Sequence, residues 1–140
     1  MIPNYSDLLG KKFEYFGRGP VAYDCAGVVI EIWKRAGIIL PIPCESSEDN
    51  AIQAQRFSQY VSELCDKIPA TAENAWGDLL PMDLIIFQIL PRYITHCGVY
   101  VGDGRFVHIM SKISVAREEL DSPMWFDKIR GFYRFRGVAA

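Results

Sequence analysis

The chain has 140 residues, of which half are apolar and 23% are charged, and its formal net charge is −2. This length suffices to bury the core of one domain, and the composition excludes a disordered segment, a collagen-like repeat and a charged linker. The small net charge gives no strong electrostatic field to attract nucleic acid or an anionic membrane. The sequence contains no run of about 18 apolar residues, so no membrane span is predicted. Because no repeat or linker is evident, we expect one domain over residues 1–140.

The first half of the chain carries the predicted helices. Residues 5–11 indicate a short early helix, and residues 24–36 indicate a longer one in which apolar side chains recur at helical spacing. Asp24 is a candidate N-cap of the longer helix and Gly37 is its stop, so Cys25 falls in the first turn. A further helix is predicted over residues 50–65.

The second half of the chain changes to strand-like patterns. Apolar or alternating runs predict strands at residues 83–88, 94–101, 105–110 and 130–136, with residues 102–104 as the turn of a hairpin. Helices followed by strands in series predict an α+β fold with a largely antiparallel sheet, rather than a doubly wound parallel one.

The N-terminus and the cysteines bear on the compartment and the chemistry. The first twelve residues show no basic segment followed by an apolar stretch, so no secretory signal is predicted and we expect synthesis in the cytoplasm. The cysteines lack the CxxC spacing of zinc or redox sites and are too few for a disulfide scaffold. We expect free thiols, with Cys25 as a candidate nucleophile and with three inert thiols, which are Cys44, Cys65 and Cys97.

Only two histidines are present, His96 and His108, and both fall in the predicted hairpin. A two-residue loop would point them to opposite faces of the sheet. A three-residue loop instead places His108 opposite Gly98 and diagonal to His96, on the same face. We predict the three-residue loop because Gly104 suits the left-handed conformation that such a loop needs.

Cys25, His96 and His108 suit the three roles of a cysteine hydrolase. A helix N-terminus and a neighbouring imidazolium lower the pKa of a thiol and favour the nucleophilic thiolate. His96 is then the base, His108 is the polar group that orients it, and the Cys25 amide is a candidate oxyanion donor. The same residues also fit a buried structural thiol beside two strand histidines, or a zinc site.

Three segments resemble the NlpC/P60 family of cysteine peptidases, in the order in which that family carries them. Asp24-Cys25-Ala26-Gly27 resembles the DCSG-like turn of the family, and residues 81–87 (PMDLIIF) resemble its PGDLVFF-like strand. Residues 95–108 (THCGVYVGDGRFVH) resemble its HVGIYIGNGKFIHA-like hairpin. The resemblance extends over nearly the whole chain and implies a papain-like α+β core, in which the nucleophile helix packs on a mostly antiparallel sheet.

The resemblance also implies a function. The family cuts the peptide stems of bacterial cell walls, typically next to γ-D-glutamate, so we expect a peptidoglycan endopeptidase. Carried over by position, Cys25 is the nucleophile, His96 the base and His108 the residue that orients the base. Neither a metal nor an organic cofactor is implied, and the expected partner is a peptidoglycan stem peptide rather than nucleic acid or a membrane. An amidase or acyltransferase on the same fold stays open.

A second resemblance concerns the phage-tail branch of that family. Residues 16–20 (FGRGP) are similar to its GRDP-like stretch, and the ending from Trp125 through Phe135 is also similar. Members of that branch are compact domains without signal peptides, carried at or near the tail tip. The resemblance therefore implies association with phage tail proteins or a virion and action at the bacterial cell wall. A catalytically weak structural component of a tail is the alternative.

Several positions depart from the family pattern. Phe13 stands where the family often has a Tyr whose hydroxyl helps the oxyanion or the substrate, and Tyr15 and Tyr23 are the candidates to replace it. Arg18 is a candidate to meet a carboxylate of the stem peptide, or else a solvated surface arginine. For Asp24, the pattern favours a helix cap over a catalytic acid. Smaller departures are Ala26 for Ser, Met82 for Gly and Cys97 for Val.

Overall fold

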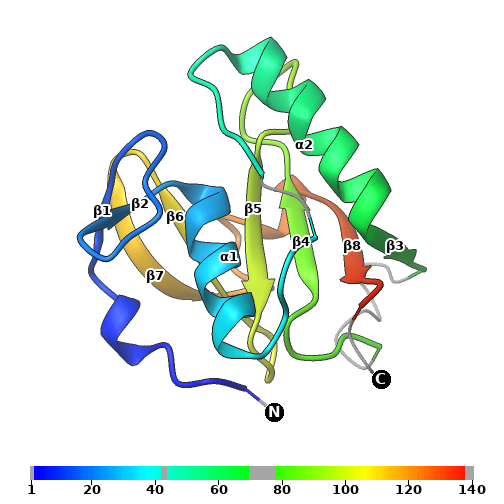
Figure 1. Ribbon diagram of the computed structural model, residues 1–140. Helices are drawn as coiled ribbons and strands as arrows, with labels where there is room; N and C mark the ends of the chain where they lie inside the picture. Colours follow the sequence, from blue (N-terminus) through cyan, green and yellow to red (C-terminus); the bar gives the residue numbers. More distant parts are fainter. Residues whose placement is uncertain (1, 42–43, 70–77, 138–140) are drawn as a thin grey trace.

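The computed structural model describes residues 2–41, 44–69 and 78–137, and its centre is a six-stranded antiparallel sheet (Figure 1). The strands lie in the order β3-β8-β4-β5-β6-β7, and each neighbouring pair is antiparallel. Their bounds are β3 Cys65–Ile68, β4 Leu84–Phe87, β5 His96–Tyr100, β6 Arg105–Met110, β7 Ile113–Glu119 and β8 Ile129–Phe135. With the two helices, this arrangement confirms the predicted α+β fold.

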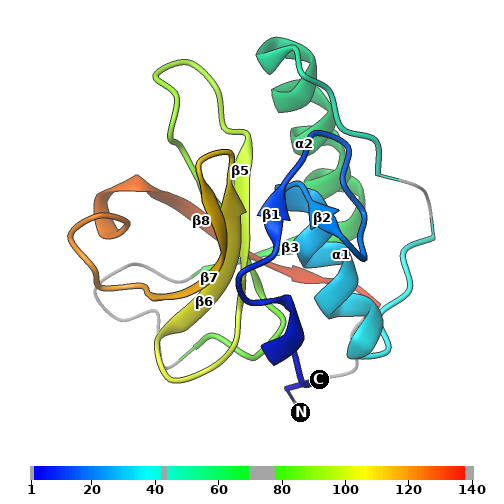
Figure 2. The ribbon, with the colours of Figure 1, turned by 90° about the vertical axis from the view of Figure 1, so that its left-hand side faces the viewer.

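One face of the sheet is covered by α1 (Cys25–Arg35) and α2 (Asn50–Leu64), with the short parallel pair β1 (Lys12–Phe13) and β2 (Ala22–Tyr23) beside them (Figure 2). The segment that contains the 3-10 turn Phe126–Lys128 lies on the opposite side. Buried side chains accordingly form two clusters. Successive side chains of a strand alternate between the two faces of the sheet. Val99 and Val107 therefore pack in the cluster on the helix side, whereas the adjacent Tyr100 and Phe106 pack in the cluster on the other side.

The start of α1 is fixed by a side-chain cap and by a close contact. The Asp24 carboxylate accepts a hydrogen bond from the Gly27 amide at 2.7 Å, which satisfies one of the unpaired amides of the first turn. A side chain at Gly27 would collide with the carbonyl oxygen of Gly17, which accepts the Asp24 amide. The glycine thus lets the preceding loop press against the first turn and fixes the position of Cys25.

The predicted helices and strands agree with the structure except near the N-terminus and at the sheet edges. Instead of a helix over 5–11, the chain forms a single 3-10 turn, Ser6–Leu8. It then leaves the helical path at Gly10, whose φ is +89°, and the Gly10 amide donates to the Val115 carbonyl at 2.9 Å. The edge strands β3 and β7 were not predicted, since an exposed edge carries polar side chains that hide the strand pattern.

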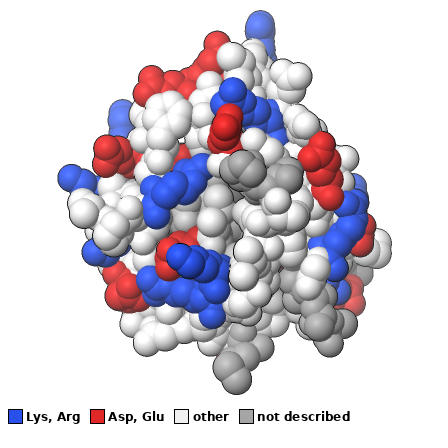
Figure 3. All heavy atoms as spheres, viewed as in Figure 1, with Lys and Arg blue, Asp and Glu red and all other residues white. Residues whose placement is uncertain are grey.

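The surface mixes both signs of charge. On the face drawn in Figure 3, acidic and basic side chains are interspersed, in keeping with the net charge of −2. Among the described residues, no helix combines the length and the apolar character that crossing a bilayer requires.

Candidate active site

Cys25 is the first residue of α1, where the helix presents its unpaired amides and its positive dipole end. The side chain is half-buried, and its Sγ lies 3.5 Å from the carbonyl oxygen of Thr95, just before β5 begins. The nucleophile predicted from sequence therefore lies between the helix N-terminus and the strand that carries His96.

Arg18 and Asp24 hold the segment that leads into the nucleophile. The Arg18 guanidinium pairs with the Asp24 carboxylate at 2.6 Å, and it also donates to the Cys44 carbonyl oxygen at 2.8 Å and to the Ser46 hydroxyl at 3.1 Å. The structure thus places Asp24 as a cap, and it places Arg18 as a brace between two loops rather than among the residues that line the cleft.

The two histidines lie side by side, in the arrangement that the three-residue loop requires. Val99 pairs with Val107, so that His108 falls opposite Gly98, and residues 102–104 all have positive φ. His96 Nε2 and His108 Nδ1 are 2.8 Å apart. A side chain at Gly98 would lie 3.3 Å from the His108 Cβ and 3.0 Å from the Phe106 ring, so glycine leaves room for the imidazoles.

Aromatic rings enclose the histidine pair on the side away from the helices. Phe87 packs on His96, with ring centroids 5.4 Å apart, and Phe106 and Trp125 pack on His108 at 4.9 and 4.6 Å. Burial in this setting, together with the charge of His96, lowers the pKa of His108 to about 4 despite the nearby Glu118. His108 is therefore neutral at physiological pH.

The four thiols divide into one whose pKa is lowered and three whose pKa is raised. Hydrogen bonding with the Cys97 thiol and with His96 lowers the pKa of Cys25 to about 5, against the opposing effect of burial. Burial raises the pKa of Cys44, and it raises the pKa of Cys65 to about 12. The hydrogen bond with Cys25 and burial hold the pKa of Cys97 well above its usual value. Only Cys25 has the electrostatics of a nucleophile.

A cleft opens over Cys25 and His96. It is lined by side chains from the N-terminal loop, from the start of α2 and from the ends of β5 and β6; these include Phe13, Tyr15, Asp24, Ser46, Asn50, Gln53, Thr95 and Met110. Phe13 and Tyr15 form an edge-to-face pair at 5.1 Å, and Tyr15 is half exposed. Tyr23, the other candidate for the missing hydroxyl, is buried in the core against Gly19 and does not line the cleft.

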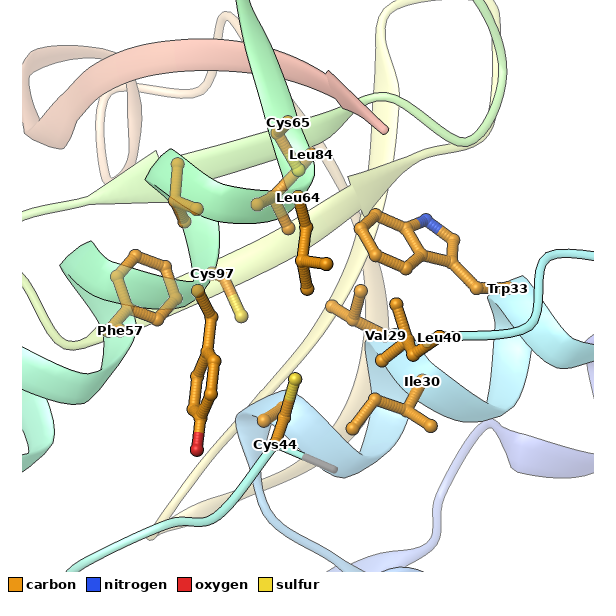
Figure 4. A pocket seen from close by; sticks show the side chains of 13 residues that line it. Val29, Ile30, Trp33, Leu40, Cys44, Phe57, Leu64, Cys65, Leu84 and Cys97 are labelled. Carbon is orange, nitrogen blue, oxygen red and sulfur yellow. The ribbon is translucent and has the colours of Figure 1, made fainter. Parts of the chain in front are cut away.

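A separate apolar hollow lies between α1 and α2 (Figure 4). Cys44 and Cys97 both contribute to its lining, with apolar side chains such as Val29, Phe57 and Leu84. The Cys97 Sγ also lies 3.7 Å from the carbonyl oxygen of Cys25. Cys97 was predicted to be inert, yet it is one of the two groups that lower the pKa of the nucleophile.

Sequence reasoning missed two residues behind the histidine pair. Glu118 on β7 binds His108 Nε2 through its Oε2, and Trp125 packs against both imidazoles. A usable signal for Glu118 existed, because β7 follows β6 after the two residues Ser111-Lys112, a spacing that predicts a hairpin. Within the described residues, no three His, Cys, Asp or Glu side chains are grouped as a metal site.

The structure is an α+β protein in which a half-buried thiol at a helix N-terminus lies close to an imidazole pair on an antiparallel sheet. The sequence model of the NlpC/P60 family matches residues 10–134. The chain belongs to the NlpC/P60 family.

Named relatives share this domain at modest identity. The chain is 27% identical over 126 residues to the probable endopeptidase p60 of Listeria monocytogenes, with 90% of this chain and 22% of that protein covered. It is 25% identical over 149 residues to the gamma-DL-glutamyl hydrolase of Bacillus subtilis, with 96% and 36% covered. The chain therefore spans only about a fifth to a third of the length of these relatives.

The fold is also shared with solved structures. A Staphylococcus aureus protein described as similar to a lipoprotein of the NLP/P60 family superposes with a TM-score of 0.62 at 26% identity. The match covers 91% of this chain and 37% of that one. This likeness confirms the predicted fold class.

Proposed function

We propose that this chain is a cysteine endopeptidase of peptidoglycan stem peptides that cuts next to γ-D-glutamate. The observation that carries the proposal is the arrangement of Cys25, His96 and His108. The pKa of the Cys25 thiol is lowered in part by His96, and His96 Nε2 lies 2.8 Å from His108 Nδ1. Two relatives support the substrate class, since one is named a probable endopeptidase and another a gamma-DL-glutamyl hydrolase.

The residues suit two successive acyl transfers. The Cys25 thiolate attacks the amide carbonyl, and the Cys25 amide and its neighbours at the helix N-terminus stabilise the oxyanion. The C–N bond then breaks as the His96 imidazolium gives its proton to the leaving amine. A water molecule, deprotonated by His96, hydrolyses the thioester, releases the new carboxylic acid and restores the thiolate. His108 holds the His96 ring in place throughout.

The cleft offers contacts that suit a peptide. Ser46, Asn50 and Gln53 supply uncharged donors and acceptors, and Tyr15 supplies a half-exposed ring with a hydroxyl. We infer that Tyr15, rather than the buried Tyr23, takes the place of the family tyrosine that Phe13 lacks.

Digestion of purified sacculi tests the proposal. Wild type and Cys25→Ala are incubated with sacculi, and the soluble products are identified by mass spectrometry. We expect wild type alone to release fragments with a new amine next to γ-D-glutamate. Products in which the peptide stem is separated from the glycan would instead indicate an amidase. Transfer of the acyl group to an added amine would indicate an acyltransferase.

A second candidate is a catalytically weak component of a phage tail. The observation in its favour is that Phe13 lines the cleft where a hydroxyl is expected. The link to phage tail proteins rests on residues 16–20 and on the C-terminal segment, and none of the relatives cited above is named as a phage protein. A sluggish wild type that is strongly activated by Phe13→Tyr would favour this candidate.

A further inference from the structure

We propose that Glu118 is a positioning residue that fixes the tautomers of the histidine pair, so that His96, whenever it is neutral, presents an unprotonated Nδ1 toward Cys25. The inference rests on the proposed function, because it concerns the base of that reaction. Glu118, on the edge strand β7, would then be the fourth residue of the site, after Cys25, His96 and His108.

The strand register brings Glu118 to His108. Glu118 lies opposite Phe106 and diagonal to His108, so both side chains project from the same face of the sheet. The Glu118 Oε2 accepts a hydrogen bond from His108 Nε2. His108 is fully buried, whereas the Glu118 side chain is 27% exposed, so the carboxylate connects the buried pair to the surface.

The protons on these side chains follow from donor and acceptor rules. An ionised carboxylate only accepts, so the His108 nitrogen that faces Glu118 carries a hydrogen. A neutral imidazole carries one hydrogen, so His108 Nδ1 is an acceptor. His96 Nε2 lies 2.8 Å from that acceptor and must donate to it. Neutral His96 then has a free lone pair on Nδ1, the nitrogen left for Cys25.

Without the carboxylate, the opposite tautomers become available. If His108 carried its hydrogen on Nδ1, it would donate to His96 Nε2, and neutral His96 would carry its own hydrogen on Nδ1. That tautomer turns an N–H toward Cys25, so neutral His96 could not accept the proton of the water that attacks the thioester. Glu118 excludes this state, because its carboxylate requires a hydrogen on His108 Nε2.

Among the groups around His108, Glu118 is the one that decides whether the neutral imidazole carries its hydrogen on Nδ1 or on Nε2. The titratable side chains that face His108 in the described residues are His96 from β5 and Glu118 from β7. In the part of the chain that the structure describes, the rings of Phe106 and Trp125 also pack on His108, and neither ring supplies an acceptor for His108 Nε2. A merely structural Glu118 would leave the tautomers unchanged when it is replaced.

The test uses the fact that the chain has only two histidines. Long-range ¹H–¹⁵N NMR of the imidazoles reports which nitrogen of each ring is protonated. The Glu118 variants are compared at pH 8.5 in a Cys25→Ala background, so that no thiolate holds His96 in its imidazolium form. We expect His108 to carry its hydrogen on Nε2 in wild type and in Glu118→Gln, whose amide oxygen still accepts. In Glu118→Leu we expect a mixture of tautomers at His108. Glu119→Gln is the matched control, because its carboxylate pairs with exposed Arg105 at 3.1 Å.

Kinetics supply the second readout. We expect kcat/KM on a γ-D-glutamyl peptide to fall roughly 10- to 100-fold in Glu118→Leu through kcat, with substantial recovery in Glu118→Gln and no change in Glu119→Gln. A His108 that carries its hydrogen on Nδ1 in wild type overturns the inference without any variant. So does an unchanged tautomer in folded Glu118→Leu. The predicted tautomers in a protein that cleaves no peptide would instead refute the proposed function alone.

Discussion

The acidity of Cys25 is the electrostatic property on which the proposed mechanism depends, and selective alkylation measures it. A thiol whose pKa is about 5 is roughly 90% thiolate at pH 6, whereas an ordinary cysteine with a pKa of about 8.5 is roughly 0.3% thiolate. The less basic thiolate is also less nucleophilic: with a Brønsted slope of about 0.45, a pKa lower by about 3.5 costs roughly 40-fold in intrinsic reactivity. We therefore expect Cys25 to react roughly eightfold faster than a free thiol at pH 6 and more slowly than it at pH 8.5.

The assay follows iodoacetamide labelling of each cysteine by peptide mapping from pH 4 to pH 9, with glutathione as the reference thiol. The Cys25 rate should rise with a midpoint near pH 5 and then stay constant. Cys97→Val and His96→Gln should each move the midpoint upward, because each removes a group that lowers the pKa of Cys25. A wild-type midpoint near pH 8.5, or a midpoint unmoved in both variants, would refute this account of the nucleophile.

Three further predictions concern stability. Asp24→Ala removes the cap on the Gly27 amide and should cost about 1 kcal/mol of unfolding free energy in urea; no change in the urea midpoint would show that the cap contributes nothing. Arg134→Leu should cost roughly 3 kcal/mol, because it leaves the buried Asp83 carboxylate without its two bonds at 2.9 Å; a loss no larger than that of an exposed arginine would contradict this. The His108 pKa of about 4 means that the unfolded chain binds a proton below about pH 6.5 that the folded chain does not bind. Stability should fall by about 3 kcal/mol as the pH drops from 6.5 to 4, and His108→Asn should lack that part of the fall in pH-dependent urea denaturation.

The parts of the site that the sequence could predict are those set by local geometry. The cap, the first turn of α1 and the hairpin between β5 and β6 depend on residues a few positions apart, so their patterns place Cys25 on a helix N-terminus and both histidines on one face. The three-residue loop was decisive, since a loop shorter by one residue would have pointed His108 away from His96.

The parts that the sequence did not predict depend on which distant segments meet. Glu118 reaches His108 only because β7 pairs with β6, and the charged pattern of that edge strand resembles a loop. Cys97 influences the nucleophile because α1 packs across β5, which a local pattern does not specify. Likewise, only the packing distinguishes Tyr15, at the cleft, from Tyr23, in the core.

The nucleophilic role of Cys25 is tested most directly by incubating L-Ala-γ-D-Glu-diaminopimelate with wild type and with Cys25→Ala and identifying the products by mass spectrometry. The α-linked isomer of the same peptide is the matched control substrate. We expect wild type to release free diaminopimelate from the γ-linked peptide alone, and we expect Cys25→Ala, folded as judged by circular dichroism, to release none. Equal rates for the two proteins would contradict the claim that the Cys25 thiolate is the nucleophile.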